Sequence, residues 1–113
     1  MQLHAGFGFD DARAIVPYLA DLGVSHLYTS PVLQAMPGST HGYDVVDHGR
    51  VSAELGGEAG FLRLSDTLRQ HGMGLVLDIV PNHMAIGEQN RWWWDVLEHG
   101  PASRYAGLSL IHI

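Results

Sequence analysis

The stretch GLVLDIVPNHM at residues 74–84 constrains the fold of this chain more than any other. Its apolar and β-branched residues 75–80 are interrupted by one carboxylate, Asp78. A near-continuous run of this kind predicts a parallel strand buried on both faces, because no alternation with polar residues is needed there. Pro81 has no N–H to donate to a neighbouring strand, so we expect the strand to end at this residue.

Two polar side chains, Asn82 and His83, follow directly after the predicted strand. In parallel α/β sheets and barrels, ligands bind at the carboxyl ends of the strands. We therefore interpret the strand as scaffold and Asp78, Asn82 and His83 as candidate site residues. His83 could instead be an ordinary surface histidine, and Asp78 a structural carboxylate held by hydrogen bonds.

The rest of the chain predicts alternating strands and helices. We expect strands at residues 2–7 and 24–29, one helix from about Asp10 to Leu22, and a second helix opening at residues 56–57. The connection at residues 32–56 is polar and rich in turn formers, and a loop of this length is usually functional. A short helix capped by Asn90 follows the third strand. This order predicts parallel strands joined by right-handed crossovers.

Two α/β folds are compatible with this order. A dinucleotide-binding sheet would place a glycine-rich phosphate loop after the first strand, but GFGFDD at residues 6–11 has acidic residues there. A barrel places its polar clusters after the strands, as at residues 37–48 and after residue 78. We predict the first three parallel strands, with their helices, of a partial TIM (β/α)8 barrel. A complete barrel takes about 250 residues, so we expect this chain to be a fragment with unpaired edges.

Composition excludes several function classes. The formal charge of −6 and six dispersed Lys and Arg residues argue against nucleic acid as a partner. The absence of cysteine excludes a disulfide framework and a thiolate metal site, and is compatible with a reducing compartment. The sequence shows neither a signal peptide nor an apolar run long enough for a membrane span. We expect a cytoplasmic chain with no membrane partner; composition leaves the oligomeric state open.

The segment DIVPNH at residues 78–83 resembles the first signature region of the α-amylase superfamily, glycoside hydrolase family 13. Four further segments narrow the resemblance to the maltooligosyl trehalose synthases, the glucan α-glucosylmutases of that superfamily. These segments are LHAGFGFDDA at 3–12, YLADLGVSHLYTSPVLQA at 18–35, PGSTHGYDVVDH at 37–48 and NRWWWDVLEHGPASRYA at 90–106. The resemblance covers residues 2–106 and implies a maltooligosaccharide as substrate.

The resemblance implies an intramolecular reaction without a cofactor. The α-1,4 bond at the reducing end of a maltooligosaccharide is rearranged to an α,α-1,1 bond, which leaves a trehalose terminus. Retaining chemistry of this kind uses two carboxyl groups about 5–5.5 Å apart. In this superfamily these groups follow the fourth and fifth strands, and a third acidic residue follows the seventh. We therefore expect no catalytic residue in this chain and no turnover by the chain alone.

The resemblance also implies roles for individual residues. Tyr43 of HGYD matches the aromatic residue that stacks on the sugar beside the scissile bond, and His83 matches a histidine that hydrogen-bonds the same glucose. Asp78 matches an aspartate that orients its neighbours. His41 and Asp44 are implied as polar groups of the pocket wall, although Asp44 also suits a plain turn.

Metal binding is not expected from these residues. Asn82 matches a position that is a calcium ligand in many amylases, but the mutases are not generally described as calcium-dependent, and we assign Asn82 to loop structure. The histidines at positions 41, 48 and 83 lack the spacing of a metal triad. Trp92 and Trp93 form an apolar helical stripe, whereas Trp94 on the other side could be a sugar platform or a contact to another domain.

On this interpretation the chain has three parts. Residues 1–86 form the start of the catalytic barrel, residues 87–107 begin an insertion after the third strand, and the LSLIHI tail at 108–113 is hypothesised to be non-native. Two alternatives remain open. One is an α-amylase-type hydrolase of the same superfamily. The other is a stand-alone carbohydrate-binding module that uses Tyr43 and the tryptophans.

Overall fold

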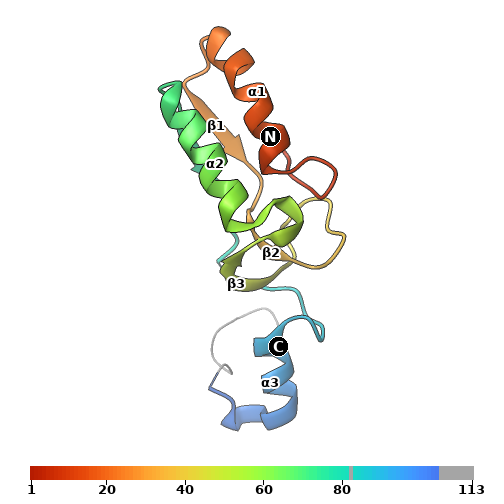
Figure 1. Ribbon diagram of the computed structural model, residues 1–113. Coiled ribbons are helices and arrows are strands. Elements are labelled where there is room, and N and C mark those ends of the chain that lie inside the picture. Colours follow the sequence, from red (N-terminus) through yellow and green to blue (C-terminus); the bar gives the residue numbers. More distant parts are fainter. Residues whose placement is uncertain (82, 105–113) are drawn as a thin grey trace.

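The computed structural model describes residues 1–81 and 83–104 (Figure 1). Asn82 and the tail at 108–113 lie outside the described residues. The elements are α1 (Phe9–Asp21), β1 (His26–Thr29), β2 (Leu33–Ala35), β3 (Val45–Val51), α2 (Gly57–Gln70), β4 (Gly74–Leu77) and α3 (Arg91–His99), with short 3-10 helices η1 (Ala53–Leu55) and η2 (Gly100–Ala102). The three predicted helices are confirmed. In the described part of the chain, no helix is long and apolar enough to cross a membrane.

The centre of the fold is a parallel pair of strands, β1 and β4, covered by two helices. His26 pairs with Gly74 and Thr29 with Leu77. Helices α1 and α2 lie side by side along β1 (Figure 1). Apolar side chains of both helices pack against the face of the sheet that carries Leu27, Leu75 and Leu77. This shared core joins the strand–helix units that the sequence predicts.

Phe9 at the start of α1 is the largest fully buried side chain in this core. Its ring packs edge-on against Phe61 of α2, with 5.6 Å between ring centroids and 70° between ring planes. Leu64 and Leu68 of α2 are also almost completely buried. Because burying a large apolar side chain stabilises a fold by about 1.5–3 kcal/mol, this contact helps to hold the two helices together.

The second face of the β1–β4 sheet is open. The exposed fraction on this face is 54% for Tyr28 and 44% for Val76. The expectation that the strand after Gly74 is buried on both faces is therefore wrong for the described residues. Strand β4 also ends at Leu77, three residues before the predicted end, although the N–H of Asp78 still donates to the carbonyl of Thr29 at 3.0 Å.

The predicted strand at residues 2–7 is not formed. His4 and Phe7 instead exchange two backbone hydrogen bonds of 3.1 and 2.9 Å that close a tight turn. Only the beginning of the segment runs beside β1. The amino group of Met1 donates to the carbonyl of Tyr28 at 2.7 Å, and the N–H of Ser30 donates to the carbonyl of Met1 at 2.9 Å. These two bonds are the pattern by which a parallel neighbour flanks one residue of a strand.

The connection at residues 32–56 contains an antiparallel pair rather than a continuous loop. Ala35 of β2 pairs with Val45 of β3, and Leu33 pairs with Val51, with irregular register between them. The β-branched residues of β3 favour this pairing. The true loop is confined to residues 36–44, where the N–H of Met36 bonds to the carbonyl of Asp44 at 3.0 Å.

Helix α3 lies at the far end of the molecule from α1 and α2, beyond β2 and β3 (Figure 1). Its predicted cap is confirmed: the side-chain oxygen of Asn90 accepts hydrogen bonds from the N–H groups of Trp92 and Trp93 at 3.0 and 3.1 Å. The chain leading to α3 is fastened to β3, because the N–H of Ala85 donates to the carbonyl of Val45 at 2.8 Å.

Candidate functional site

Tyr43 and Asp78 meet at the carboxyl end of the β1–β4 pair. The hydroxyl of Tyr43 donates a hydrogen bond to Oδ2 of Asp78. Tyr43 comes from the 36–44 loop, whereas Asp78 directly follows β4. The contact therefore joins the two segments in which the sequence predicts site residues, at the end of the strands where α/β folds bind ligands.

A second tyrosine, Tyr28 of β1, shares the same carboxylate. The interaction of its hydroxyl with Asp78, through hydrogen bonding first and then desolvation and the negative charge, raises the pKa of Tyr28. The pKa of Tyr43 is raised for the same reasons, with a small contribution from Tyr28. Both hydroxyls are thus held in their protonated, donating form around one carboxylate.

His41 packs on the ring of Tyr43. The two rings are stacked with 5.9 Å between centroids and 29° between planes. The backbone N–H of Tyr43 also donates to Nδ1 of His41 at 3.0 Å. The predicted residue His41 therefore lies in the cluster, and its contact supports one face of the Tyr43 ring.

Asp44 stabilises the turn that carries Tyr43. The hydroxyl of Ser39 donates to Oδ1 of Asp44 at 2.6 Å, and the same oxygen lies 3.9 Å from Nδ1 of His41. Ser39 in turn accepts a hydrogen bond from the N–H of Gly42 at 3.0 Å. These bonds indicate that Asp44 stabilises the turn. A turn residue was one of the two roles predicted for it, the other being a polar group of the pocket wall.

Gly42 fixes the path of this loop over the end of β1. Its φ of +81° is a left-handed conformation, and a Cβ atom at this position would lie 2.8 Å from the carbonyl oxygen of Pro31. Only glycine permits both the backbone angle and the close approach. The loop therefore passes close to the residues that follow β1, which brings Tyr43 within reach of Asp78.

The remaining predicted site residues are Asn82 and His83. Asn82 lies outside the described residues, so its predicted role in the loop has no geometry here. His83 is half-buried in the segment between β4 and α3. That segment is held near β3, because Nε2 of His48 lies 3.3 Å from the carbonyl oxygen of Val80. Among the described residues, no three His, Asp or Glu side chains are grouped to hold a metal ion.

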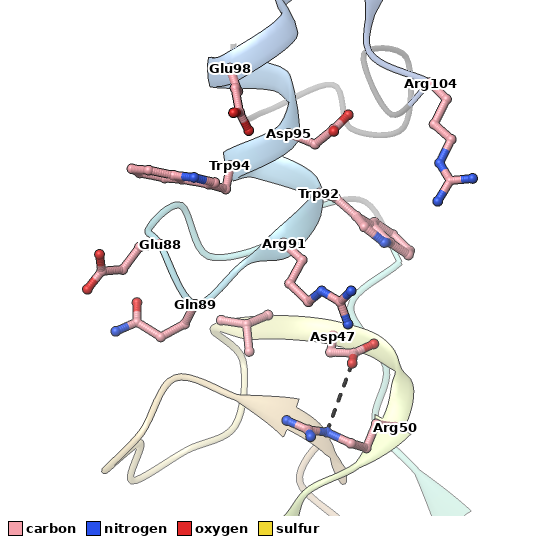
Figure 2. Close-up of a pocket in the computed structure, with 11 residues that line it drawn as sticks. Asp47, Arg50, Glu88, Gln89, Arg91, Trp92, Trp94, Asp95, Glu98 and Arg104 are labelled. Atoms are coloured by element: carbon pink, nitrogen blue, oxygen red, sulfur yellow. Dashed lines mark ion pairs between the residues drawn. The ribbon is translucent and has the colours of Figure 1, made fainter.

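A separate pocket of about 540 Å³ lies between β3 and α3 (Figure 2). Acidic, basic and tryptophan side chains line it, and none of the predicted site residues does. Its lining is Val46, Asp47, Arg50, Glu88, Gln89, Arg91, Trp92, Trp94, Asp95, Glu98 and Arg104. The indole of Trp94 is 51% exposed, whereas Trp92 is half-buried, with its ring centroid 6.2 Å from that of His48. The tyrosine–carboxylate cluster and this pocket are therefore two distinct features.

Comparison with known protein families identifies the family to which the chain belongs. The family described as the α-amylase catalytic domain matches residues 13–107. The chain belongs to the α-amylase family. The match includes both Tyr28 and Tyr43 as well as Asp78, so the whole cluster lies within the conserved domain of this family.

Among the relatives of this α-amylase family chain are maltooligosyl trehalose synthases. A protein of Mycobacterium tuberculosis described as a maltooligosyl trehalose synthase is 60% identical over 103 residues, which is 89% of this chain and 14% of that protein. The structure of the maltooligosyltrehalose synthase from Arthrobacter ramosus superposes with a TM-score of 0.91 and 54% identity, over 94% of this chain and 14% of that one. An intracellular maltogenic amylase of Bacillus subtilis is 39% identical over 95 residues, covering 84% of this chain and 16% of the amylase. The chain thus spans about one seventh of the length of the synthases it matches.

Sequence reasoning missed Tyr28 in this α-amylase family chain. The available signal was the alternation of side chains along parallel strands. Tyr28 pairs in register with Val76, and Asp78 lies two residues further along that chain, so all three fall on one face. Alternation alone does not give this pairing, because the register between the two strands comes from the structure.

Proposed function

We propose that this chain is the start of the catalytic barrel of a maltooligosyl trehalose synthase. The parent enzyme would rearrange the reducing-end α-1,4 bond of a maltooligosaccharide to an α,α-1,1 bond. The observation that carries the proposal is the 60% and 54% identity to two such synthases over most of this chain. The position of the tyrosine–carboxylate cluster at the carboxyl end of parallel strands supports it.

In this proposal β1 and β4 are the second and third strands of the barrel, and Met1 lies beside β1 in the place of the first. The hydrogen bonds between Met1 and β1 support the sequential strand order. The open face with Tyr28 and Val76 would then point into the barrel, where the rest of the enzyme covers it. Residues 1–86 belong to the barrel and residues 87–107 to an insertion that begins before α3.

The cluster supplies a wall of the sugar site rather than the bond-breaking groups. The ring of Tyr43 is 38% exposed and is supported by His41 on one face and by Asp78 at its hydroxyl. A flat ring held in this way suits stacking on the apolar face of a pyranose. His83 would donate to the same glucose. The catalytic carboxylates, with the acid and nucleophile roles, would come from the rest of the parent enzyme.

The second candidate function is hydrolysis of α-1,4 bonds, favoured by the 39% identity to the maltogenic amylase. The two reactions differ in the number of reducing ends. The full-length enzyme incubated with maltopentaose separates them by a reducing-end assay together with chromatography of the products. Rearrangement predicts fewer reducing ends at unchanged chain length. New reducing ends and shorter chains would overturn the proposal in favour of the hydrolase.

The binding-module alternative is tested on the 113-residue chain itself. We propose that the chain alone neither turns over nor saturably binds maltooligosaccharide, because the open face of β1 and β4 leaves apolar surface in water. Calorimetric titration with maltopentaose is the measurement. Saturable binding by a folded monomer would support the module instead.

A further inference from the structure

We propose that Tyr28 is a positioning residue for sugar binding: it anchors the Asp78 carboxylate that in turn fixes the ring of Tyr43. Asp78 is the shared acceptor, Tyr43 is the surface offered to the sugar, and Tyr28 acts through Asp78 without contacting the sugar. The identity of the sugar rests on the proposed function, whereas the three-residue arrangement rests on the structure.

The register of β1 and β4 places the three groups together. Tyr28 pairs with Val76, and the ladder continues through the bond from the N–H of Asp78 to the carbonyl of Thr29 at 3.0 Å. Leu27 and Thr29 are buried against the helices, so Tyr28 points to the opposite face. Asp78 is two residues beyond Val76 and falls on that same face. A rigid strand pair therefore holds Tyr28 and Asp78 side by side.

Tyr43 lies on a loop rather than on a strand. Within the 36–44 loop, the hydroxyl of Tyr43 donates to Oδ2 of Asp78 at the end of β4. A carboxylate has two oxygens and can accept from both tyrosines at once. A donor on each side fixes the rotation of the carboxylate, and the fixed carboxylate then fixes the Tyr43 ring. Binding surfaces depend on such support, because a loosely held ring loses affinity.

The same carboxylate affects both tyrosines. Asp78 raises the pKa of both tyrosines through hydrogen bonding, and Tyr28 contributes to the rise at Tyr43. Loss of either donor should change how Asp78 holds the remaining one, so the contributions of Tyr28 and Tyr43 to binding should be coupled.

A double-mutant cycle in the full-length enzyme tests the proposal. The variants are Tyr28→Phe, Tyr43→Phe and the double variant, each of which keeps the rings and removes only hydroxyls. The control is Tyr18→Phe, whose side chain is 64% exposed on α1, a helix that packs on the opposite face of the sheet. The measurements are KM and kcat on maltopentaose, with thermal unfolding of each variant.

We expect Tyr28→Phe to raise KM about three- to tenfold with kcat nearly unchanged, the effect of losing one charge-assisted hydrogen bond. The double variant should raise KM by much less than the product of the two single effects. The control should change neither constant. A merely structural role would lower the unfolding temperature and the active fraction, and hence kcat, without this coupling.

Three results would overturn the proposal: an unchanged KM in Tyr28→Phe, a fall in kcat alone, or single effects that multiply in the double variant. Failure of the proposed function is seen separately in the wild-type enzyme. If that enzyme releases new reducing ends, the mutase assignment is wrong. The coupling between Tyr28 and Tyr43 can then still be measured from the KM values for hydrolysis.

Discussion

The hydroxyl of Tyr43 donates a hydrogen bond to Asp78 across 35 positions of sequence. This bond connects the loop between β2 and β3 to the carboxyl end of the parallel strand pair. It brings together two segments that are separate in sequence, HGYD and DIVPNH, so that they share one surface.

Replacing Asp78 by asparagine should alter stability at high pH. The pKa values of Tyr28 and Tyr43 are raised above their ordinary value of 10.0 by the hydrogen bonds to Asp78. Because the folded state holds these protons more tightly than the unfolded state, their contribution is complete below pH 10 and is lost as pH rises through the raised pKa values.

The measurement is the unfolding temperature of the full-length enzyme between pH 9 and 11.5, about the ordinary tyrosine range. Asp78→Asn should show a smaller change with pH than the wild type. Asp21→Asn, at the exposed end of α1, is the matched control and should follow the wild type. A wild-type slope retained in Asp78→Asn would contradict the shared-carboxylate arrangement.

Gly42→Ala should displace Tyr43 and weaken sugar binding. Alanine at φ +81° is strained, and its Cβ atom would meet the carbonyl oxygen of Pro31 at 2.8 Å. Gly38→Ala is the matched control, because Gly38 has φ +77° and no atom within 4 Å of the added Cβ. Both variants carry a backbone cost of about 1–3 kcal/mol. Only Gly42→Ala should also raise KM for maltopentaose; equal KM values in the two variants would argue against a role of this contact.

Phe9→Ala should destabilise the packing of α1 on α2. Removing a fully buried phenylalanine leaves a cavity and costs about 3–5 kcal/mol. Leu62→Ala on the outer side of α2, where Leu62 is 53% exposed, should cost no more than about 0.5 kcal/mol. Urea unfolding followed by tryptophan fluorescence compares the two variants in the full-length enzyme. A shift of the Phe9→Ala midpoint no larger than that of Leu62→Ala would show that this core does not form as described.

The ion pair between the helices should contribute to stability at neutral pH and lose its contribution in acid. Arg63 donates two hydrogen bonds of 3.0 Å to Asp10, and this bonding lowers the pKa of Asp10 below 3.8. A lowered folded-state pKa adds stability above the unfolded value, and this is lost as pH falls through the folded one. The difference in unfolding temperature between wild type and Asp10→Asn should therefore shrink as pH is lowered from 6 toward about 3. A difference that stays constant with pH would exclude the ion pair as its source.

The sequence predicted the helices better than the strands. The helices carry caps and apolar stripes that are local signals, as at Asn90 and around Leu64 and Leu68. Sequence segments that resemble the family predicted Tyr43, Asp78 and His41 as site residues. The structure brings these three side chains together. Whether they bind sugar remains a prediction.

The strand errors have a common physical origin. Strand pairing depends on partners distant in sequence, so local patterns did not show that residues 2–7 close a turn between His4 and Phe7. Local patterns also missed the β2–β3 pair inside the polar connection, because β2 is only three residues long. Tyr28 was missed because its role follows from the register with Val76, which the sequence does not state.

The most direct test is the crystal structure of the full-length enzyme with a bound maltooligosaccharide. We predict a glucose ring stacked on Tyr43, with the Tyr43 hydroxyl still bonded to Asp78 and Tyr28 behind it on the strand. A sugar bound instead in the pocket beside Trp94, with Tyr43 turned away from Asp78 and free of sugar, would contradict the account.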